Sequence, residues 1–180
     1  TSRGDMPAGA LILAIGHSAR DTLEMLYSKG FPMEAKGFGI GMRIEHRREY
    51  INDLVYGRGH NPDLPTASYH LVTHLPTGRS VYSFCMCPGG EIIPCTSTKG
   101  LLCTNGMSLY ARSGDFANSA VITTVNGRDF KSAEDAFGMI ERIERAAFEA
   151  GGLDYTAPAQ SAACFMDGEQ GHLPGETSYR

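Results

Sequence analysis

The chain has 180 residues, of which 42% are hydrophobic and 20% charged, and its formal net charge is −4 at pH 7. That balance is typical of a folded globular protein and excludes a wholly disordered chain. The basic residues are scattered along the chain, so we expect neither a nucleic acid nor an anionic membrane as a partner, because both require a concentrated basic face.

The first 32 residues predict a fragment of an α/β domain. ALILAI, residues 10–15, is an apolar run of strand length that ends at Gly16, and it predicts a buried strand. Four apolar residues follow at helical spacing, namely Leu23, Met25, Leu26 and Tyr27. Gly30 is suited to end that helix, since glycine readily adopts the left-handed conformation found there. A strand, a glycine turn and a helix in this order are typical of the start of a parallel α/β arrangement.

Residues 33–156 predict an antiparallel sheet with one or two packed helices. Short apolar segments joined by Pro- and Gly-containing turns are typical of a meander rather than of β-α-β units. The expected strands are Phe38–Glu45, Ser68–Leu75, Ser80–Cys87, Glu91–Cys95, Leu101–Thr104 and Asn118–Val125. The expected helices are 46–57 and a longer one that begins at the N-cap Ser132 and ends at Gly151. The fold class is therefore α+β, and residues 157–180, rich in Gly, Pro and Ala, are expected to form a connector.

The segment SFCMCPGGEIIPC, residues 83–95, places three cysteines around a Pro-Gly-Gly turn. On its own it predicts a β-hairpin. If residues 88–90 form a three-residue turn, Cys87 lies opposite Glu91 and Cys95 lies opposite Ser83. Cys85 and Cys87 then point to one face of the strand, because side chains alternate along it.

The cysteine spacing favours neither a metal site nor a local disulfide. Zinc sites normally use two closely spaced pairs of ligands, and this segment has only one such pair. A disulfide between Cys85 and Cys87 would close a strained ring. Cys95 and Cys103 are expected to pack as small apolar residues, whereas Cys85 and Cys87 are accessible enough to lie beside a ligand.

Three other patterns predict little chemistry by themselves. KGFGIG, residues 36–41, lacks the preceding strand and following helix that a dinucleotide-binding loop requires. The six histidines include no pair at metal-ligand spacing, so no metal site is expected. Arg43 with Glu45 has the chemistry to bind a carboxylate or the polar edge of a cofactor, although such residues are more often surface groups.

The composition also predicts the compartment. Five cysteines are an odd number, and a chain of 180 residues builds a core without disulfides, so we expect reduced thiols in a cytoplasm. No apolar run approaches the roughly 20 residues that span a bilayer, and no membrane partner is expected.

Several long strings in the chain resemble a family of FAD-dependent (NAD/FAD-utilising) dehydrogenases that is itself uncharacterised. These strings are LILAIGHSARDTLEML, KGFGIGMRIEH, VYSFCMCPGGEIIPC, CTNGMSLYARSGDFANSAVITTVN and YTAPAQ. In that family, an α+β domain is inserted into a Rossmann-type FAD domain and covers the flavin. The resemblance implies that residues 1–32 are an edge of the FAD domain, 33–156 the inserted substrate or cap domain, and 157–180 the connector back.

The resemblance also implies site residues. The residues expected near FAD are Ala14, Gly16, His17, Gly89, Gly90, Asn105 and Gly106, and the catalytic candidates are Cys85 and Cys87. The family's GxGxxG loop has no counterpart in this chain, and neither do its ribose-binding acid and its closing FAD segment. We therefore expect a fragment that neither binds FAD well nor acts on its unknown small-molecule substrate without the remainder of the FAD domain.

Two alternatives of other classes stay open from the sequence. One is a non-catalytic binding or assembly module, because no nucleophile–base pair or acid–base constellation is evident in the sequence. The other is a thiol redox or zinc module built on Cys85, Cys87 and Cys95.

Overall fold

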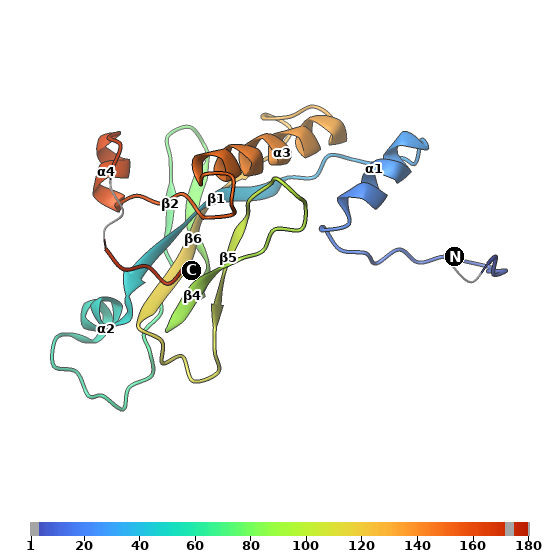
Figure 1. The fold of residues 1–180 in the computed structure, drawn as a ribbon. Helices are drawn as coiled ribbons and strands as arrows, with labels where there is room; N and C mark the ends of the chain where they lie inside the picture. The colour runs from blue at the N-terminus through green and yellow to red at the C-terminus, as the bar shows by residue number, and fades with distance from the viewer. Residues whose placement is uncertain (1–3, 172–174, 180) are drawn as a thin grey trace. The chain divides into compact units, whose positions relative to one another are not determined.

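The chain divides into two compact units in a computed structural model that describes residues 4–171 and 175–179. The units are Thr1–Met33 and Glu34–Arg180, a division that falls one residue beyond the boundary expected from the sequence (Figure 1). The assignment of the parts to an FAD-domain edge, an inserted domain and a connector stays a prediction.

The first unit contains the predicted helix but not the predicted strand. Helix α1 spans Arg20–Ser28 and is followed by Gly30 with a positive φ of 80°. Residues 10–15 form no strand, and Leu11 and Ile12 are 81% and 89% exposed, so the expectation of a buried strand is wrong for this chain. A strand requires hydrogen-bonding neighbours on its edges, and the described part of this unit contains no other strand to supply them.

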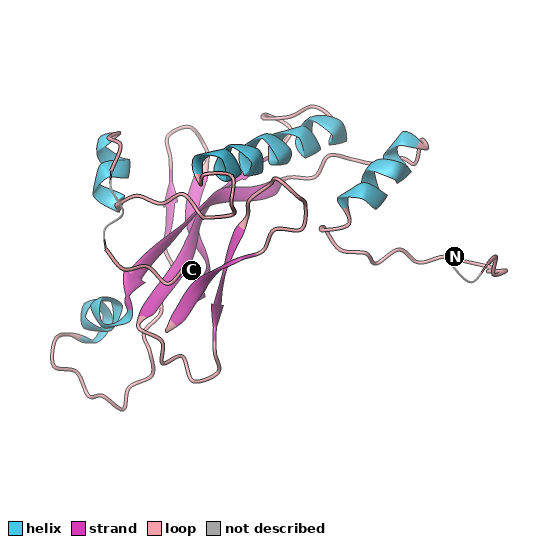
Figure 2. Cartoon of the chain, viewed as in Figure 1, coloured by secondary structure: helices cyan, strands magenta, loops and turns pink. Residues whose placement is uncertain are grey.

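The second unit is built on a four-stranded antiparallel sheet, and the predicted α+β fold class is confirmed (Figures 1 and 2). The strand order is β1-β6-β3-β2. The bounds are β1 Phe38–Arg47, β2 Val72–His74, β3 Ser80–Cys87 and β6 Phe116–Val125. Strand β6 pairs with β1 on one side and β3 on the other, so the sheet is not the simple meander that consecutive pairing would produce.

A second, two-stranded sheet replaces the expected hairpin at residues 83–95. Strand β4 (Gly90–Pro94) pairs with β5 (Thr104–Ser108), and β3 pairs with β2 and β6 instead. Cys87 therefore lies opposite Asn118 rather than Glu91, and the pairing expected from a three-residue turn is wrong. The physical reason is at Gly89, whose φ of 58° directs the chain out of the first sheet, so that Gly90 begins the second.

Two helices cover opposite ends of the larger sheet (Figure 1). Helix α2 (Arg48–Tyr56) buries Ile51 against Ala67 and Ala117. Helix α3 (Ala133–Ala150) begins at Ser132, whose side chain accepts a hydrogen bond from Asp135 N, as the sequence predicted. The buried hydrophobic residues accordingly form two small clusters, one beside each helix.

The core beneath α3 is aromatic and aliphatic. Phe130 is 3% exposed and stacks on Phe38 of β1 with the ring centroids 5.6 Å apart. Leu101 and Leu102 are also buried, and Leu102 N donates to Glu144 O of α3. These two leucines were expected to begin a strand. Leu102 bonds to the helix instead, and strand β5 begins only at Thr104.

The C-terminal segment packs on both sheets. It contains a short helix, α4 (Ala162–Asp167), that the sequence pattern did not predict. Further along, Ser178 N donates to Glu45 of β1, and Ser178 Oγ accepts from Ile92 N of β4. Ser178 therefore anchors this part of the expected connector to strands β1 and β4. In the described ranges, no helix has the length and apolar character needed to cross a membrane.

Candidate functional site

Arg43 of β1 lies at the centre of a polar cluster between the two sheets. Its Nε donates to Asn118 Oδ1 at 2.8 Å, and its Nη1 donates to Asn105 Oδ1 at 3.3 Å. Its Nη2 donates to the carbonyl oxygen of Cys85 at 3.0 Å. Three neutral oxygens on β6, β5 and β3 thus fix the guanidinium, whose planar fork of donors suits several acceptors at once.

An irregularity in β3 aims the Cys85 carbonyl at Arg43. The register with β6 shifts between Phe84 and Cys87, which is the signature of a β-bulge. Cys85 adopts a φ of 45° within it, a conformation uncommon for a residue other than glycine. The bulge also brings Cys87 Sγ to 3.7 Å from Arg43 Nη2. Both predicted catalytic cysteines therefore contact Arg43, one through its carbonyl oxygen and one through its sulfur.

No carboxylate of residues 4–171 or 175–179 is in close contact with the charge of Arg43. Among the described residues Arg43 forms no ion pair. Glu45, two residues further along the same face of β1, accepts hydrogen bonds from Ser178 instead. Arg43 is therefore a half-buried cation held by neutral groups, and the expectation that Arg43 and Glu45 bind a carboxylate or the polar edge of a cofactor stays a prediction.

Asn118 is the buried member of the cluster. It is fully buried, and its Nδ2 has no hydrogen-bond partner within the described structure. A buried amide donor without a partner costs about 1–3 kcal/mol. A buried donor of this kind calls for an explanation, such as an ordered water, a bound ion, local strain or a functional role.

Gly106 of β5 is required by the cluster itself. A Cβ at this position would lie 2.2 Å from Arg43 Nη2 and 2.2 Å from Asn118 Oδ1. Neighbouring Asn105 supplies its side-chain oxygen both to Arg43 and to Gly106 N. The Asn-Gly pair that the resemblance implied for the site thus lies against Arg43, because only a glycine leaves room for the guanidinium.

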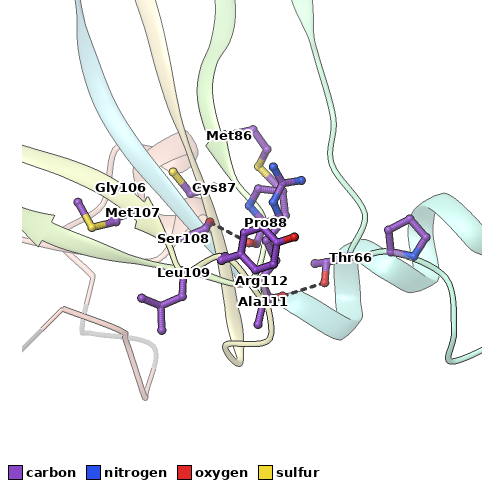
Figure 3. A pocket seen from close by; sticks show the side chains of 12 residues that line it. Thr66, Met86, Cys87, Pro88, Gly106, Met107, Ser108, Leu109, Ala111 and Arg112 are labelled. Carbon is purple, nitrogen blue, oxygen red and sulfur yellow. Dashed lines mark hydrogen bonds between the residues drawn. The ribbon is translucent and has the colours of Figure 1, made fainter.

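A pocket of about 720 Å³ adjoins this cluster and shares Cys87 and Gly106 with it (Figure 3). Its lining residues are Pro65, Thr66, Met86, Cys87, Pro88, Gly106, Met107, Ser108, Leu109, Tyr110, Ala111 and Arg112. The wall is held by Ser108 Oγ, which donates to Pro88 O, and by Thr66 Oγ1, which donates to Arg112 O, both at 2.8 Å. The volume lies within the range of about 300–1,000 Å³ that is usual for small-molecule sites.

Gly89 and Gly90 lie behind the wall of this pocket, and packing within the chain accounts for both. A Cβ on Gly89 would lie 1.9 Å from Arg112 O, and one on Gly90 would lie 2.5 Å from Met107 O. Both residues are buried. Gly89 makes room for the chain's own loop 109–114 and Gly90 for strand β5, and the approach of both glycines to FAD stays a prediction.

The remaining predicted FAD contacts lie in the first unit. Ala14, Gly16 and His17 are exposed, and Gly16 has a φ of 71° with open space around its Cα. Their approach to FAD also stays a prediction, because the two units are not placed relative to each other.

Sequence reasoning named Arg43 as a possible binding residue, but it missed Asn118 and the convergence of three strands on Arg43. The alternation of Phe38, Ile40 and Met42 places Arg43 on the opposite face of β1, which is a signal that the sequence did contain. No sequence signal marked Asn118, because its role depends on pairing with both β1 and β3. In the described residues no group of three or more His, Cys, Asp or Glu side chains is placed to hold a metal, so the zinc alternative gains no support.

Comparisons with known proteins identify the family of this chain. The chain matches a family model described as "FAD-dependent protein, C-terminal domain-like" over residues 37–180, a range that includes the Arg43 cluster and the pocket. It is 50% identical over 161 residues to an uncharacterised protein from Clostridium beijerinckii. That alignment covers 87% of this chain and 30% of the relative, so the chain spans less than a third of the relative's length.

Proposed function

The chain belongs to the FAD-dependent protein, C-terminal domain-like family, and from this membership we propose that it forms the substrate-facing part of an FAD-dependent oxidoreductase. The resemblance to an FAD-dependent family is thereby confirmed. In this proposal the chain covers the flavin and shapes the substrate site of a longer protein. The family description speaks of a C-terminal domain, and insertion of the chain into an FAD-binding domain stays a prediction.

The observation that carries the proposal is the convergence on Arg43 of residues that the resemblance implied for the site. Cys85, Cys87 and Asn105 each contact Arg43, and Gly106 makes room for it. These four residues come from β3 and β5, and Arg43 itself comes from β1. Their meeting point adjoins a pocket of ligand size.

The residues fit the polar edge of a flavin or an anionic substrate. Within the described structure, Arg43 brings a positive charge without a close carboxylate, and the buried Asn118 Nδ2 is a donor without a hydrogen-bond partner. Both features favour an electron-rich group, because positive charge and donors held in place stabilise negative charge in a partly desolvated site. When bound, FAD supplies the electron transfer that amino-acid side chains do not provide. Arg43 orients the bound group, and the loop 109–112 shields one side of the pocket.

The test uses the full-length parent protein with two arginine variants on the same strand. Arg43→Gln removes the charge from the cluster, whereas Arg47→Gln removes an exposed charge that pairs with Glu176. We expect the wild-type protein to hold FAD and Arg43→Gln to lower the flavin midpoint potential by about 30 mV or more, which corresponds to about tenfold for a two-electron couple. Arg47→Gln should leave the potential unchanged.

Two outcomes count against the proposal at different levels. A full-length protein that neither purifies with flavin nor reconstitutes with it would exclude the function altogether. A flavoprotein in which Arg43→Gln and Arg47→Gln have the same potential and the same flavin affinity would keep the family function but remove Arg43 from the site.

A further inference from the structure

A second pair of cysteines lies just beyond the end of the two-stranded sheet that is formed by Pro94 and Thr104. Cys95 directly follows Pro94, and Cys103 directly precedes Thr104. Because Pro94 and Thr104 are the last register pair of the sheet, the two cysteines lie opposite each other. Cys95 N donates to Cys103 O at 3.0 Å. The two sulfurs are 3.2 Å apart, with Cys95 Sγ donating to Cys103 Sγ. Both side chains were expected to pack as small apolar residues, yet Cys95 is exposed and Cys103 only half-buried.

The strand pairing places the two cysteines within reach of a disulfide. Residues directly opposite each other in an antiparallel pair have Cα atoms about 4.5–5.5 Å apart, and disulfides usually join Cα atoms roughly 4.4–6.8 Å apart. The pair is irregular, because Cys103 N donates to Thr96 Oγ1 rather than to Cys95 O. The sulfurs need to approach by about 1 Å to reach a bond length near 2 Å.

Cys85 and Cys87 lack this geometry although they are closer in sequence. Cys87 Sγ donates to the carbonyl oxygen of Cys85 at 3.3 Å and also contacts Arg43. No contact between the two sulfurs occurs within the described structure. The pair that the spacing made conspicuous is therefore not the pair that the fold brings together.

The loop between Cys95 and Cys103 is anchored at its far side. Gly100 N donates to Tyr155 Oη at 3.0 Å, and Leu102 N donates to Glu144 O at 2.9 Å. These contacts hold the loop without help from the two cysteines. A bond between the sulfurs therefore closes a loop whose conformation is already set, so little additional ordering is needed.

We propose that Cys95 and Cys103 form a redox-active dithiol site that undergoes thiol–disulfide exchange with a low-molecular-weight disulfide. The site uses residues other than those of the Arg43 cluster, although Cys103 lies two residues from Asn105, and it does not depend on the proposed flavin function. Exposure of Cys95 allows a small disulfide to reach it, and the half-buried Cys103 is placed to complete the exchange.

The exchange proceeds in two balanced steps. The deprotonated sulfur of Cys95 attacks one sulfur of the small disulfide, forming a mixed disulfide and releasing one thiol after it takes up a proton. The deprotonated sulfur of Cys103 then attacks Cys95 Sγ, which forms the Cys95–Cys103 disulfide and releases the second thiol. Two electrons pass from the protein dithiol to the small disulfide, which is reduced to two thiols.

The test treats the full chain with oxidised glutathione and maps the products by tryptic digestion without reduction. Cleavage after Lys99 separates residues 80–99, which carry Cys85, Cys87 and Cys95, from residues 100–112, which carry Cys103. We expect a cross-link between these two peptides in the wild-type chain. It should persist in Cys85→Ser and Cys87→Ser, the matched controls, and disappear in Cys95→Ser.

Cys103→Ser distinguishes the two steps of the exchange. This variant should retain one glutathione on Cys95 and release half as much thiol from this site as the wild-type chain. The proposal is overturned if the wild-type peptides stay unlinked while other cysteines, such as Cys164, become glutathionylated, which proves that the reagent was active. It is also overturned if the cross-link survives in Cys95→Ser. Neither readout involves flavin, so failure here is distinct from failure of the proposed function.

Discussion

Replacement of Gly106 by alanine tests whether the Arg43 cluster is as tightly built as the structure indicates. The added Cβ would lie 2.2 Å from Arg43 Nη2, 2.2 Å from Asn118 Oδ1 and 2.7 Å from Arg43 Cζ. These distances are too short for any real contact, so at least one of the two side chains must move. Asn118 has little room to do so because it is fully buried.

The expected cost follows from the two groups displaced. Overpacking costs about 1–3 kcal/mol, and loss of a hydrogen bond to a charged group costs about 1.5–3 kcal/mol. Alanine also returns about 0.5–1 kcal/mol, because glycine in a strand loses more backbone freedom on folding. We expect Gly106→Ala to lower the free energy of unfolding by about 2–4 kcal/mol, which is a large part of the stability of a typical domain.

Urea unfolding of the full chain, followed by far-UV circular dichroism, measures this change. Gly127→Ala is the matched control, since its Cβ would have nothing within 4 Å and its φ is not positive, and it should change stability by less than about 0.5 kcal/mol. In an Arg43→Ala background the penalty of Gly106→Ala should fall by at least about half. Equal penalties in both backgrounds would refute the role of Arg43 in excluding a side chain at Gly106.

Three further predictions concern stability. Burial lowers the pKa of His46 below its usual 6.5, and Glu45 opposes this shift. As the pH falls, the unfolded chain therefore takes up the proton before the folded chain does, and the free energy of unfolding should fall below about pH 6.5. In urea unfolding at a series of pH values, His46→Gln should show a flatter dependence of stability on pH than the wild-type chain. Ser132→Ala removes the N-cap of α3 and should cost about 1 kcal/mol, measured by the same unfolding assay. Phe130→Ala removes a buried ring stacked on Phe38 and should cost about 3–5 kcal/mol, seen as a lower urea midpoint.

Each of these predictions has its own control. His46→Gln and the wild-type chain showing parallel pH profiles would remove His46 as the cause of the acid-side loss. Ser113→Ala, in an exposed loop, should be neutral, and a cost equal to that of Ser132→Ala would contradict the capping role. Phe84 is 54% exposed, so Phe84→Ala should cost far less than Phe130→Ala, and similar costs would contradict the placement of the core.

Features that depend on neighbouring residues in the sequence were predictable. The strand at Ser80–Cys87 and the start of α3 at Ser132 agree with the structure, because alternation and N-capping act within a few residues. The long strings shared with a known family also predicted an FAD-dependent relative, which the family match confirms. A periodic pattern or a shared string lies within one segment of the chain, so it can be recognised without knowing which distant residues that segment contacts.

Pairing between distant segments was decided only in the tertiary structure. Residues 10–15 have the composition of a buried strand, but a strand forms only where a neighbouring strand supplies hydrogen bonds. In this chain the segment forms no strand and is exposed. Residues 88–90 have the composition of a hairpin turn. However, β3 pairs with β2 along one edge and with β6 along the other, so β4 pairs with β5 instead.

The sequence by itself determined which residue types were available for a site, and the fold decided which of them meet. Cys85, Cys87 and Arg43 were candidates from the sequence, whereas the role of Asn118 and the Cys95–Cys103 pair became evident only from strand register. The reason is physical. A register is set by the sum of many weak contacts across a sheet, and a shift of one residue would turn each of these side chains to the other face.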